Sequence, residues 1–230
     1  MESKFTKTTD KLKKEKKLKK KFRLVVILLL LLLLILYFVM GIVYNSGNFS
    51  ITLDKNLYLD NGILIYDDFQ YKVYRTELLA KAPKTFNSIK EVWLPEEIKN
   101  YEGGSHNGDS YLVYTFYIEN TGNDVAGYTR EVIIDDVIKN VDTAIRVRIY
   151  KNGEYQTYAK LSSEGVVEPN TVPFIDDKII MREDVTNFKP NDIDKYTIVL
   201  WVEGEDPDCN DNILGGEFKV RMNFRPIDAE

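Results

Sequence analysis

Residues 217–224 read EFKVRMNF, and this stretch decides the class of fold. Phe218, Val220, Met222 and Phe224 alternate with polar or charged neighbours. Successive side chains of an extended chain point to opposite faces, so this period of two predicts a β-strand. One face of that strand lies in a core and the other in solvent, as in an antiparallel sheet that is covered on one side.

Further strands are expected on either side along the chain. Residues 111–118 (YLVYTFYI) and 196–202 (YTIVLWV) are apolar on both faces, which is typical of central strands. Asn152-Gly153 separates two strand patterns and favours a type I′ hairpin. The other predicted strands are 49–53, 57–59, 63–66, 71–74, 129–134 and 178–181. Roughly eight to ten strands with turns between them predict a mainly β fold, an antiparallel, jelly-roll-like β-sandwich.

A few short helices interrupt this pattern. Helical turns are expected at residues 77–80, 88–93 and 135–142, and residues 95–98 begin with proline, as many helices do. Trp93 and Trp201 are predicted to be core aromatics.

Residues 24–44 read LVVILLLLLLLILYFVMGIVY and carry no charge. As a helix they would extend roughly 31 Å, about the thickness of the hydrocarbon core of a bilayer. We therefore expect one N-terminal transmembrane helix. The chain then has three parts: a basic cytoplasmic tail (1–23), a transmembrane signal-anchor helix (24–44) and an extracellular β-sandwich domain (45–230).

The charge distribution predicts the orientation. Residues 1–23 hold eleven Lys and Arg against three acidic residues, a net charge of +8, while the whole chain carries −5 and the remainder therefore −13. Basic residues beside a span stay in the cytoplasm, so the protein is expected to be a single-pass protein of the cell membrane with its C-terminal domain outside. The basic run favours the lipid bilayer as a partner and not nucleic acid.

A signal peptide has the same layout, and this alternative stays open. The apolar run is longer than the usual signal-peptide core, and no A-x-A site follows it. The nearest small residues are Gly41, Ser46 and Gly47, so cleavage would fall near Ser46 or Gly47. We favour an uncleaved anchor, with residues 45–48 as a linker of at most about 14 Å.

The densest polar stretch is the loop at residues 203–212, EGEDPDCNDN. Counted from Asp206, oxygen-bearing side chains recur at positions 3, 5, 7 and 12, nearly as in a calcium-binding EF-hand loop. Asp211 replaces the glycine of that motif, and the flanks read as strands. The alternative is a solvated acidic turn. The tentative Ca²⁺ ligands are Asp206, Asp208, Asn210, Asn212 and Glu217; no other cofactor is expected.

Catalytic motifs are missing from the sequence. It contains no HExxH, no GxSxG and no Walker A motif, and its single histidine, His106, lies in a loop of exposed composition. Cys209 is the single cysteine, so there is no disulfide framework, and it is expected to be a small buried side chain. The sequence favours a protein that is not an enzyme.

Several segments resemble exported surface proteins of Gram-positive bacteria of the TasA/camelysin family. They are NFSITLDKN (48–56), YTFYIENTG (114–122), AIRVRIYKNG (144–153) and YTIVLWVEGEDPDC with NDNILGGEFKVRMNF (196–224). The resemblance implies a jelly-roll sandwich and, in matrix-forming members, fibres in which one subunit donates a terminal strand to the next. Residues 49–53 would be the donor. Camelysin members are described as metalloproteases, but no matching zinc motif is present here.

Together these features predict a non-enzymatic, membrane-anchored structural or interaction protein of the bacterial envelope. It would contact itself or other surface proteins through edge strands. The alternatives are a cleaved subunit of a fibre or biofilm matrix, a calcium-binding surface module, and a camelysin-like metalloprotease.

Overall fold

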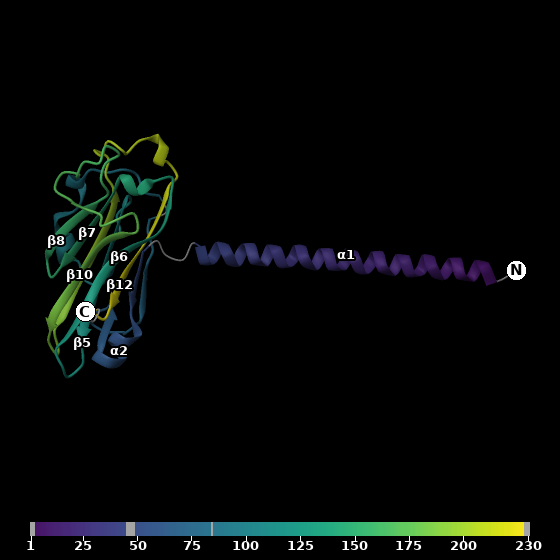
Figure 1. The fold of residues 1–230 in the computed structure, drawn as a ribbon, viewed down its shortest axis with the longest axis horizontal. Coiled ribbons are helices and arrows are strands. Elements are labelled where there is room, and N and C mark those ends of the chain that lie inside the picture. The colour runs from purple at the N-terminus through teal and green to yellow at the C-terminus, as the bar shows by residue number, and fades with distance from the viewer. Residues whose placement is uncertain (1–2, 45–48, 84, 228–230) are drawn as a thin grey trace. The chain divides into compact units, whose positions relative to one another are not determined.

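The structure is a computed structural model that describes residues 3–44, 49–83 and 85–227 (Figure 1). The chain divides into two compact units, Met1–Ser46 and Gly47–Glu230. The predicted linker at residues 45–48, with the cleavage positions Ser46 and Gly47, lies outside the described residues.

The first unit contains one helix, α1 (Ser3–Tyr44). Its segment Lys14–Met40 is long and apolar enough to cross a membrane, with a mean hydropathy of 3.1 in its most apolar window and no buried residue there. A signal sequence near the N-terminus has the same character. The predicted apolar helix is confirmed, and α1 extends it upstream through the basic segment.

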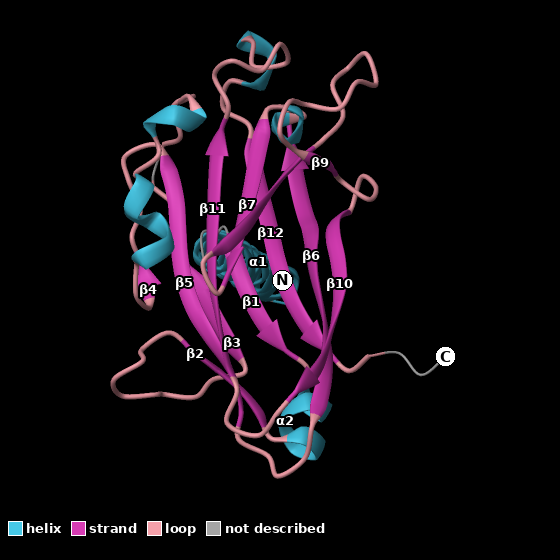
Figure 2. Cartoon of the chain, turned by 90° about the vertical axis from the view of Figure 1, so that its left-hand side faces the viewer, coloured by secondary structure: helices cyan, strands magenta, loops and turns pink. Residues whose placement is uncertain are grey.

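The second unit is built from two β-sheets (Figure 2). The first sheet has the order β10-β6-β12-β1-β3. Its strands are β1 (Phe49–Leu53), β3 (Glu77–Ala80), β6 (Ala126–Ile138), β10 (Ile179–Phe188) and β12 (Glu217–Arg225).

The second sheet has the order β2-β5-β11-β7-β8-β9, and β4 also pairs with β5. Its strands are β2 (Ile63–Tyr66), β4 (Gly104–Ser105), β5 (Tyr111–Asn120), β7 (Ile145–Lys151), β8 (Glu154–Ala159), β9 (Val172–Pro173) and β11 (Ile193–Val202). The short helices are α2 (Lys55–Asn61) and the 3₁₀ helices η1 (Glu91–Trp93), η2 (Glu96–Asn100), η3 (Val141–Thr143) and η4 (Asp211–Ile213). The predicted mainly β fold with a few short helices is confirmed.

Aromatic side chains from both sheets meet in the core. The ring of Phe224 on β12 packs edge-to-face against Phe116 on β5 and Tyr196 on β11, with centroid separations of 5.8 and 5.5 Å. All three side chains are almost completely buried. Because such rings remove a large apolar area from water and have a preferred packing geometry, they join the two sheets into one sandwich.

Eight of the described strands have the order of a jelly roll, and β1, β2, β4 and β9 are added to it. Without β1, the first sheet would contain β3, β12, β6 and β10, and the second sheet is centred on β5, β11, β7 and β8. When these eight strands are numbered in chain order, the first sheet contains the first, eighth, third and sixth strands, and the second sheet contains the second, seventh, fourth and fifth. This is the strand order of two interlocked Greek keys. β1 therefore fills a place between β3 and β12.

Most strand pairs of the sandwich are antiparallel, as predicted, and two are parallel. β1 runs parallel to β12, from Phe49 opposite Val220 to Leu53 opposite Phe224, and antiparallel to β3. β8 and β9 are also parallel. A parallel partner must come from a distant part of the chain, and β1 and β12 stand at opposite ends of the sandwich sequence.

The central strands of the second sheet are buried on both faces. Its inner face packs into the main core, while Val113, Val199 and Trp201 on its outer face form a second apolar cluster with Leu94 and Ile98. The segment that contains η1 and η2 thus covers the outer face. This cover explains why β5 and β11 read as apolar on both faces, and the predicted central strands are confirmed.

The predicted type I′ hairpin joins β7 and β8. Asn152 and Gly153 both have positive φ, 52° and 93°, as that turn requires.

Two predicted elements have the wrong type. Residues 77–80 form strand β3 and not a helical turn, because pairing with β1 overrides the helical preference of Glu-Leu-Leu-Ala. Residues 57–59 lie in α2 and not in a strand. That helix begins after Asp54, whose carboxylate accepts a hydrogen bond from the backbone N–H of Asn56, and ends at Gly62 with a left-handed φ of 67°.

Other predicted boundaries also shift. Residues 71–74 are not a strand. β6 continues to Ile138, so the helical turn predicted at residues 135–142 is reduced to η3, which begins at Val141. Only η1 is helical within 88–93, and Pro95 caps the 3₁₀ helix η2 without being part of it. Trp93 is 63% exposed, so its prediction as a core residue is wrong, whereas Trp201 is buried as predicted.

The position of β1 generates a stability prediction. Ile51 is completely buried between the sheets, so Ile51→Ala should lower the free energy of unfolding by about 2–5 kcal/mol. Ser50→Ala, on the opposite face of the same strand, should change it by less than about 0.5 kcal/mol. Urea unfolding followed by tryptophan fluorescence measures both. Equal effects would contradict the placement of β1 in the core.

Candidate functional site

The predicted acidic site lies in the loop between β11 and β12, which includes η4. Its backbone is shaped by short side-chain contacts: Asp206 accepts a hydrogen bond from the N–H of Asp208 at 2.7 Å, and Asn210 accepts one from the N–H of Asn212 at 3.0 Å. Such local bonds are typical of turns rich in Asp and Asn. The second carboxylate oxygen of Asp208 accepts the N–H of Ser163 at 2.9 Å, which ties this loop to the loop after β8.

Asp206 points inward to a buried arginine. Its Oδ2 lies 2.6 Å from Nη2 of Arg146 on β7, in an ion pair without the alignment of a hydrogen bond. The same Nη2 donates to Glu168 at 3.0 Å. The side chains of Arg146, Glu168 and Asp206 are 5%, 8% and 0% exposed. We call these three residues the Arg146 network.

The Arg146 network holds more negative than positive charge. Burial raises the pKa of the Glu168 carboxyl, and the nearby carboxylate of Asp206 raises it further, while Arg146 opposes both effects. One guanidinium thus faces two carboxylates that come from separate loops. The ion pairs hold the loops that contain Glu168 and Asp206 against one end of β7. Removing one partner of a buried ion pair is strongly destabilising, because it leaves the other charge uncompensated.

The five tentative calcium ligands are not assembled as a ligand shell. Asp206 and Asp208 are used as described above, Asn212 lies exposed in η4, and Glu217 is the exposed first residue of β12. Among the described residues, no group of three or more His, Cys, Asp or Glu side chains is placed to hold a metal ion. The calcium site therefore stays a prediction from sequence.

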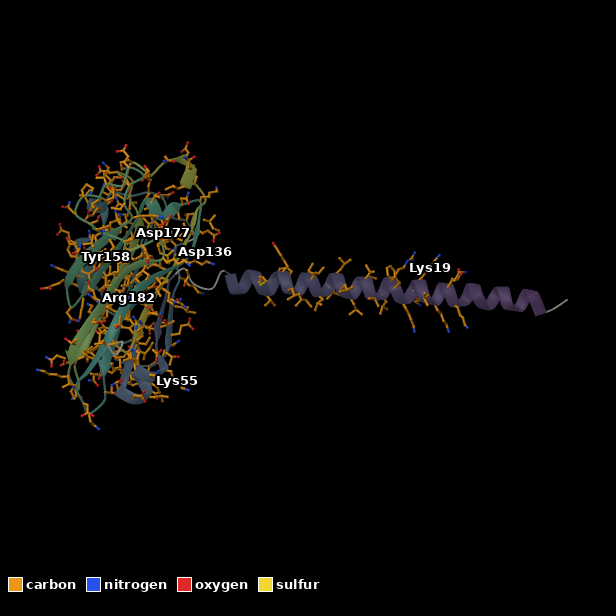
Figure 3. All side chains as sticks on the ribbon, in the orientation of Figure 1. Lys19, Lys55, Asp136, Tyr158, Asp177 and Arg182 are labelled. Atoms are coloured by element: carbon orange, nitrogen blue, oxygen red, sulfur yellow. The ribbon has the colours of Figure 1, made fainter. Side chains whose placement is uncertain are left out.

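A second set of polar groups lies between the sheets. The hydroxyl of Tyr128 donates to Asp194 at 2.5 Å and contacts the hydroxyl of Tyr196 at 2.9 Å. Nearby, the Tyr158 hydroxyl (Figure 3) donates to Glu183 at 3.4 Å. Burial raises the pKa of Tyr158 to about 12, with a further increase from the charge of Glu183. These tyrosines therefore stay protonated near neutral pH and act as hydrogen-bond donors.

The outer face of the second sheet holds another arginine, Arg148. Its guanidinium lies 4.4 Å from the ring of Tyr155 and 5.2 Å from that of Trp201, and its Nε donates to Thr157 at 2.9 Å. It also forms an ion pair with Glu91. In the sequence, Arg146 and Arg148 alternate with the apolar residues of β7, and this pattern does not reveal that their face is covered. No local pattern marks their carboxylate partners, which lie in distant loops.

The two residues with reactive side chains occupy ordinary positions. Cys209 is partly buried and packs against the main core, as expected for a small side chain. His106 lies in the loop after β4, where its ring stacks on Tyr101 at 4.8 Å and contacts the backbone carbonyl of Glu102.

No protein-family model matches this sequence, and a search of curated proteins gives no match. Matching solved structures include two of a β-glucosidase from Kluyveromyces marxianus, one selenomethionine-labelled and one in complex with glucose. Identities are 12% and 10% and TM-scores 0.25 and 0.26. The matches cover 52% and 72% of this chain but only 12% and 15% of the β-glucosidase chains. Likeness at these TM-scores carries no argument about activity.

The Arg146 network predicts an unequal response to the loss of two arginines. Arg146→Met leaves two buried carboxylates without a counter-charge and should lower the free energy of unfolding by about 3–5 kcal/mol. Arg182→Met is the matched control and should cost less, since Arg182 (Figure 3) is 47% exposed and its buried partner Glu131 keeps an ion pair with Arg225 at 3.6 Å. Guanidinium denaturation measures both, and a larger loss for Arg182→Met would contradict this reading.

A calcium titration tests the acidic loop. Because Asp206 already faces Arg146, calcium binding there would have to break a buried ion pair. We therefore expect the melting temperature to stay constant when millimolar CaCl₂ replaces chelator. A rise that disappears in Asp206→Asn with Asp208→Asn would instead support the calcium-binding hypothesis.

Proposed function

We propose that this protein is a membrane-anchored structural or interaction protein on the outside of the bacterial envelope and that it does not act as an enzyme. The observation that carries the proposal is the pairing of one exposed apolar helix with a separate sandwich that has its own core. A fully apolar helical surface is stable in lipid, where its backbone groups are already satisfied within the helix.

The charges support an outward-facing sandwich. The exposed basic side chains of Lys14–Arg23 precede the apolar segment, while the chain after it is strongly acidic. Translocation leaves basic flanks in the cytoplasm, and an acidic domain outside is repelled by anionic lipid and stays soluble.

The polar clusters support a structural role for this protein. Arg146, Arg148, Tyr128 and Tyr158 each use their polar groups on neighbouring side chains, so the buried polar groups stabilise loops and sheet contacts. These contacts fit a structural role for the four residues.

Partners would bind at the sheet edges. In the described strands, the edges of the first sheet are β3 and β10, and those of the second are β2 and β9. An open edge offers unpaired backbone groups to another strand, whether from a second copy or from another surface protein. Arg182, Glu183 and Asp184 at the centre of β10 disfavour indiscriminate pairing there.

One observation favours a fibre or biofilm-matrix subunit as the second candidate. β1 is the first strand of the sandwich, and it lies between β3 and β12 with hydrogen-bonded neighbours on both sides. If cleavage freed the N-terminus, the same strand from another copy could fill this place, as in donor-strand assembly and as the resemblance to TasA implies. Here β1 occupies the place within its own chain.

Cysteine labelling of intact cells tests the proposed topology. In a Cys209→Ser background, Tyr155→Cys on β8 should react with a membrane-impermeant maleimide, because Tyr155 is 57% exposed. Lys16→Cys should react only after the membrane is permeabilised. Reaction of Lys16→Cys on intact cells would contradict the orientation. N-terminal sequencing of the labelled protein should give Met1; a start near Ser46 or Gly47 would favour the fibre subunit.

A further inference from the structure

The edge strands of the sandwich differ greatly in length. Among the described strands, β2 and β3 have four residues each and β9 has two, whereas β10 has ten. β9 also contains Pro173, which has no backbone N–H to offer to another strand. Short strands and prolines commonly protect a sheet edge from other chains. β10, at the border of the first sheet in Figure 2, is neither short nor interrupted by proline.

The middle of β10 is regular, while both of its ends are not. Its pairing with β6 runs without interruption from Met181 opposite Val132 to Val185 opposite Tyr128. The register shifts just before and just after this segment. Because a β-bulge bends a strand and disrupts its ladder, residues 181–185 are the part of this edge that a further strand could follow.

The sequence of this segment, MREDV, is symmetric in character about its central residue, Glu183. Met181 and Val185 are apolar, and Arg182 and Asp184 carry opposite charges. In an antiparallel pair of identical strands with a two-fold axis at Glu183, each residue faces the one at equal distance beyond the axis. Arg182 of each copy then lies opposite Asp184 of the other. The apolar ends of the segment face each other in the same way.

The two charged side chains that flank the centre are exposed and partly used within their own sheet. Arg182 donates from Nε to Glu131 at 3.0 Å, and Asp184 accepts the hydroxyl of Thr129 at 2.6 Å. A guanidinium has five N–H donors and a carboxylate has two acceptor oxygens, so both side chains can take a second partner. Opposite charges that face each other across two strands stabilise the pair, whereas like charges destabilise it.

The like charges that would meet at the axis are balanced within each copy. Glu183 forms an ion pair with the guanidinium of Arg130 and accepts the hydroxyl of Tyr158 at 3.4 Å. The side chain of Arg130 is only 12% exposed, while that of Glu183 is 49% exposed. Each Glu183 thus brings its own counter-charge to the pair, which reduces the repulsion between the two carboxylates.

We propose that β10 pairs antiparallel with β10 of a second copy of this chain, through residues 181–185 and about a two-fold axis at Glu183. The inference rests on the proposed function and deepens it, because it names the partner at one of the sheet edges of an interaction protein. The central charges disfavour other strands and favour this one, since few sequences place opposite charges across from both Arg182 and Asp184.

The dimer is expected to be weak and reversible. Five paired residues bury little surface, and the repulsion between two acidic sandwiches opposes association until salt screens it. Anchoring of both copies in one membrane would raise their effective concentration and favour the pair.

Disulfide trapping on the full chain tests the register. In a Cys209→Ser background, in lipid vesicles at about 0.15 M salt, Glu183→Cys should give a covalent dimer. Residues that face each other in an antiparallel pair have Cα atoms roughly 4.5–5.5 Å apart, which a disulfide can span. The matched control is Thr186→Cys, also exposed on β10, whose two copies would be about 20 Å apart. Trapping should be several-fold faster for Glu183→Cys, and equal rates would overturn the proposal.

Charge reversal separates pairing through β10 from contacts elsewhere. Sedimentation of the full chain in density-matched detergent measures the dissociation constant, and thermal melting confirms that each variant is folded. Arg182→Asp and Asp184→Arg each place like charges across the strands, so each should weaken the dimer about tenfold. The double change exchanges the charges and should restore it.

Three results would overturn the proposed pairing: a chain that stays monomeric, a dimer that responds to neither single change, or a double change that restores nothing. None of them bears on the membrane anchor or the orientation of the sandwich, which labelling of Lys16→Cys measures separately.

Discussion

The parallel pairing of β1 with β12 is the constraint on which the sandwich depends. It brings the first strand after α1 against the last strand of the chain, and it places Phe49, Ile51 and Leu53 in the core. It also gives β3 a partner, since β3 joins the first sheet only through β1. Eight other strands of the two sheets can be traced as a jelly roll without β1, and β1 fills the place between β3 and β12.

The outer face of the second sheet is covered at its centre, and this burial determines which partners its polar side chains need. The arginines of β7 are buried on that face, and each takes carboxylate partners from outside the sheet: Arg148 from η1, and Arg146 from the loops that hold Glu168 and Asp206. Arg146 takes two carboxylates, and Arg148 takes aromatic rings, a hydroxyl and a carboxylate. The sequence pattern of β7 is typical of a strand with one face in solvent. Because that face is buried, its arginines form ion pairs and hydrogen bonds that join the sheet to the segments around it.

Local sequence patterns were enough to predict most of the strands but not how the strands are arranged. The alternation in β12 and the Asn-Gly turn after β7 each have a physical cause within a few residues, so both were predicted correctly. The parallel place of β1, the strand character of residues 77–80 and the ion pair between Arg146 and Asp206 depend on contacts between residues far apart in sequence. The acidic loop shows the same limit, because a spacing typical of calcium ligands does not reveal that Asp206 turns inward toward an arginine.

The direction of β1 has a mechanical consequence. Tension between the N-terminal and C-terminal ends of the sandwich would draw β1 and β12 in opposite directions along their common axis, because the two strands are parallel. The backbone bonds that join them would then bear the load in shear, all at once, whereas strands peeled from an end lose their bonds one at a time. A domain built in this way resists separation from its own first strand under such tension.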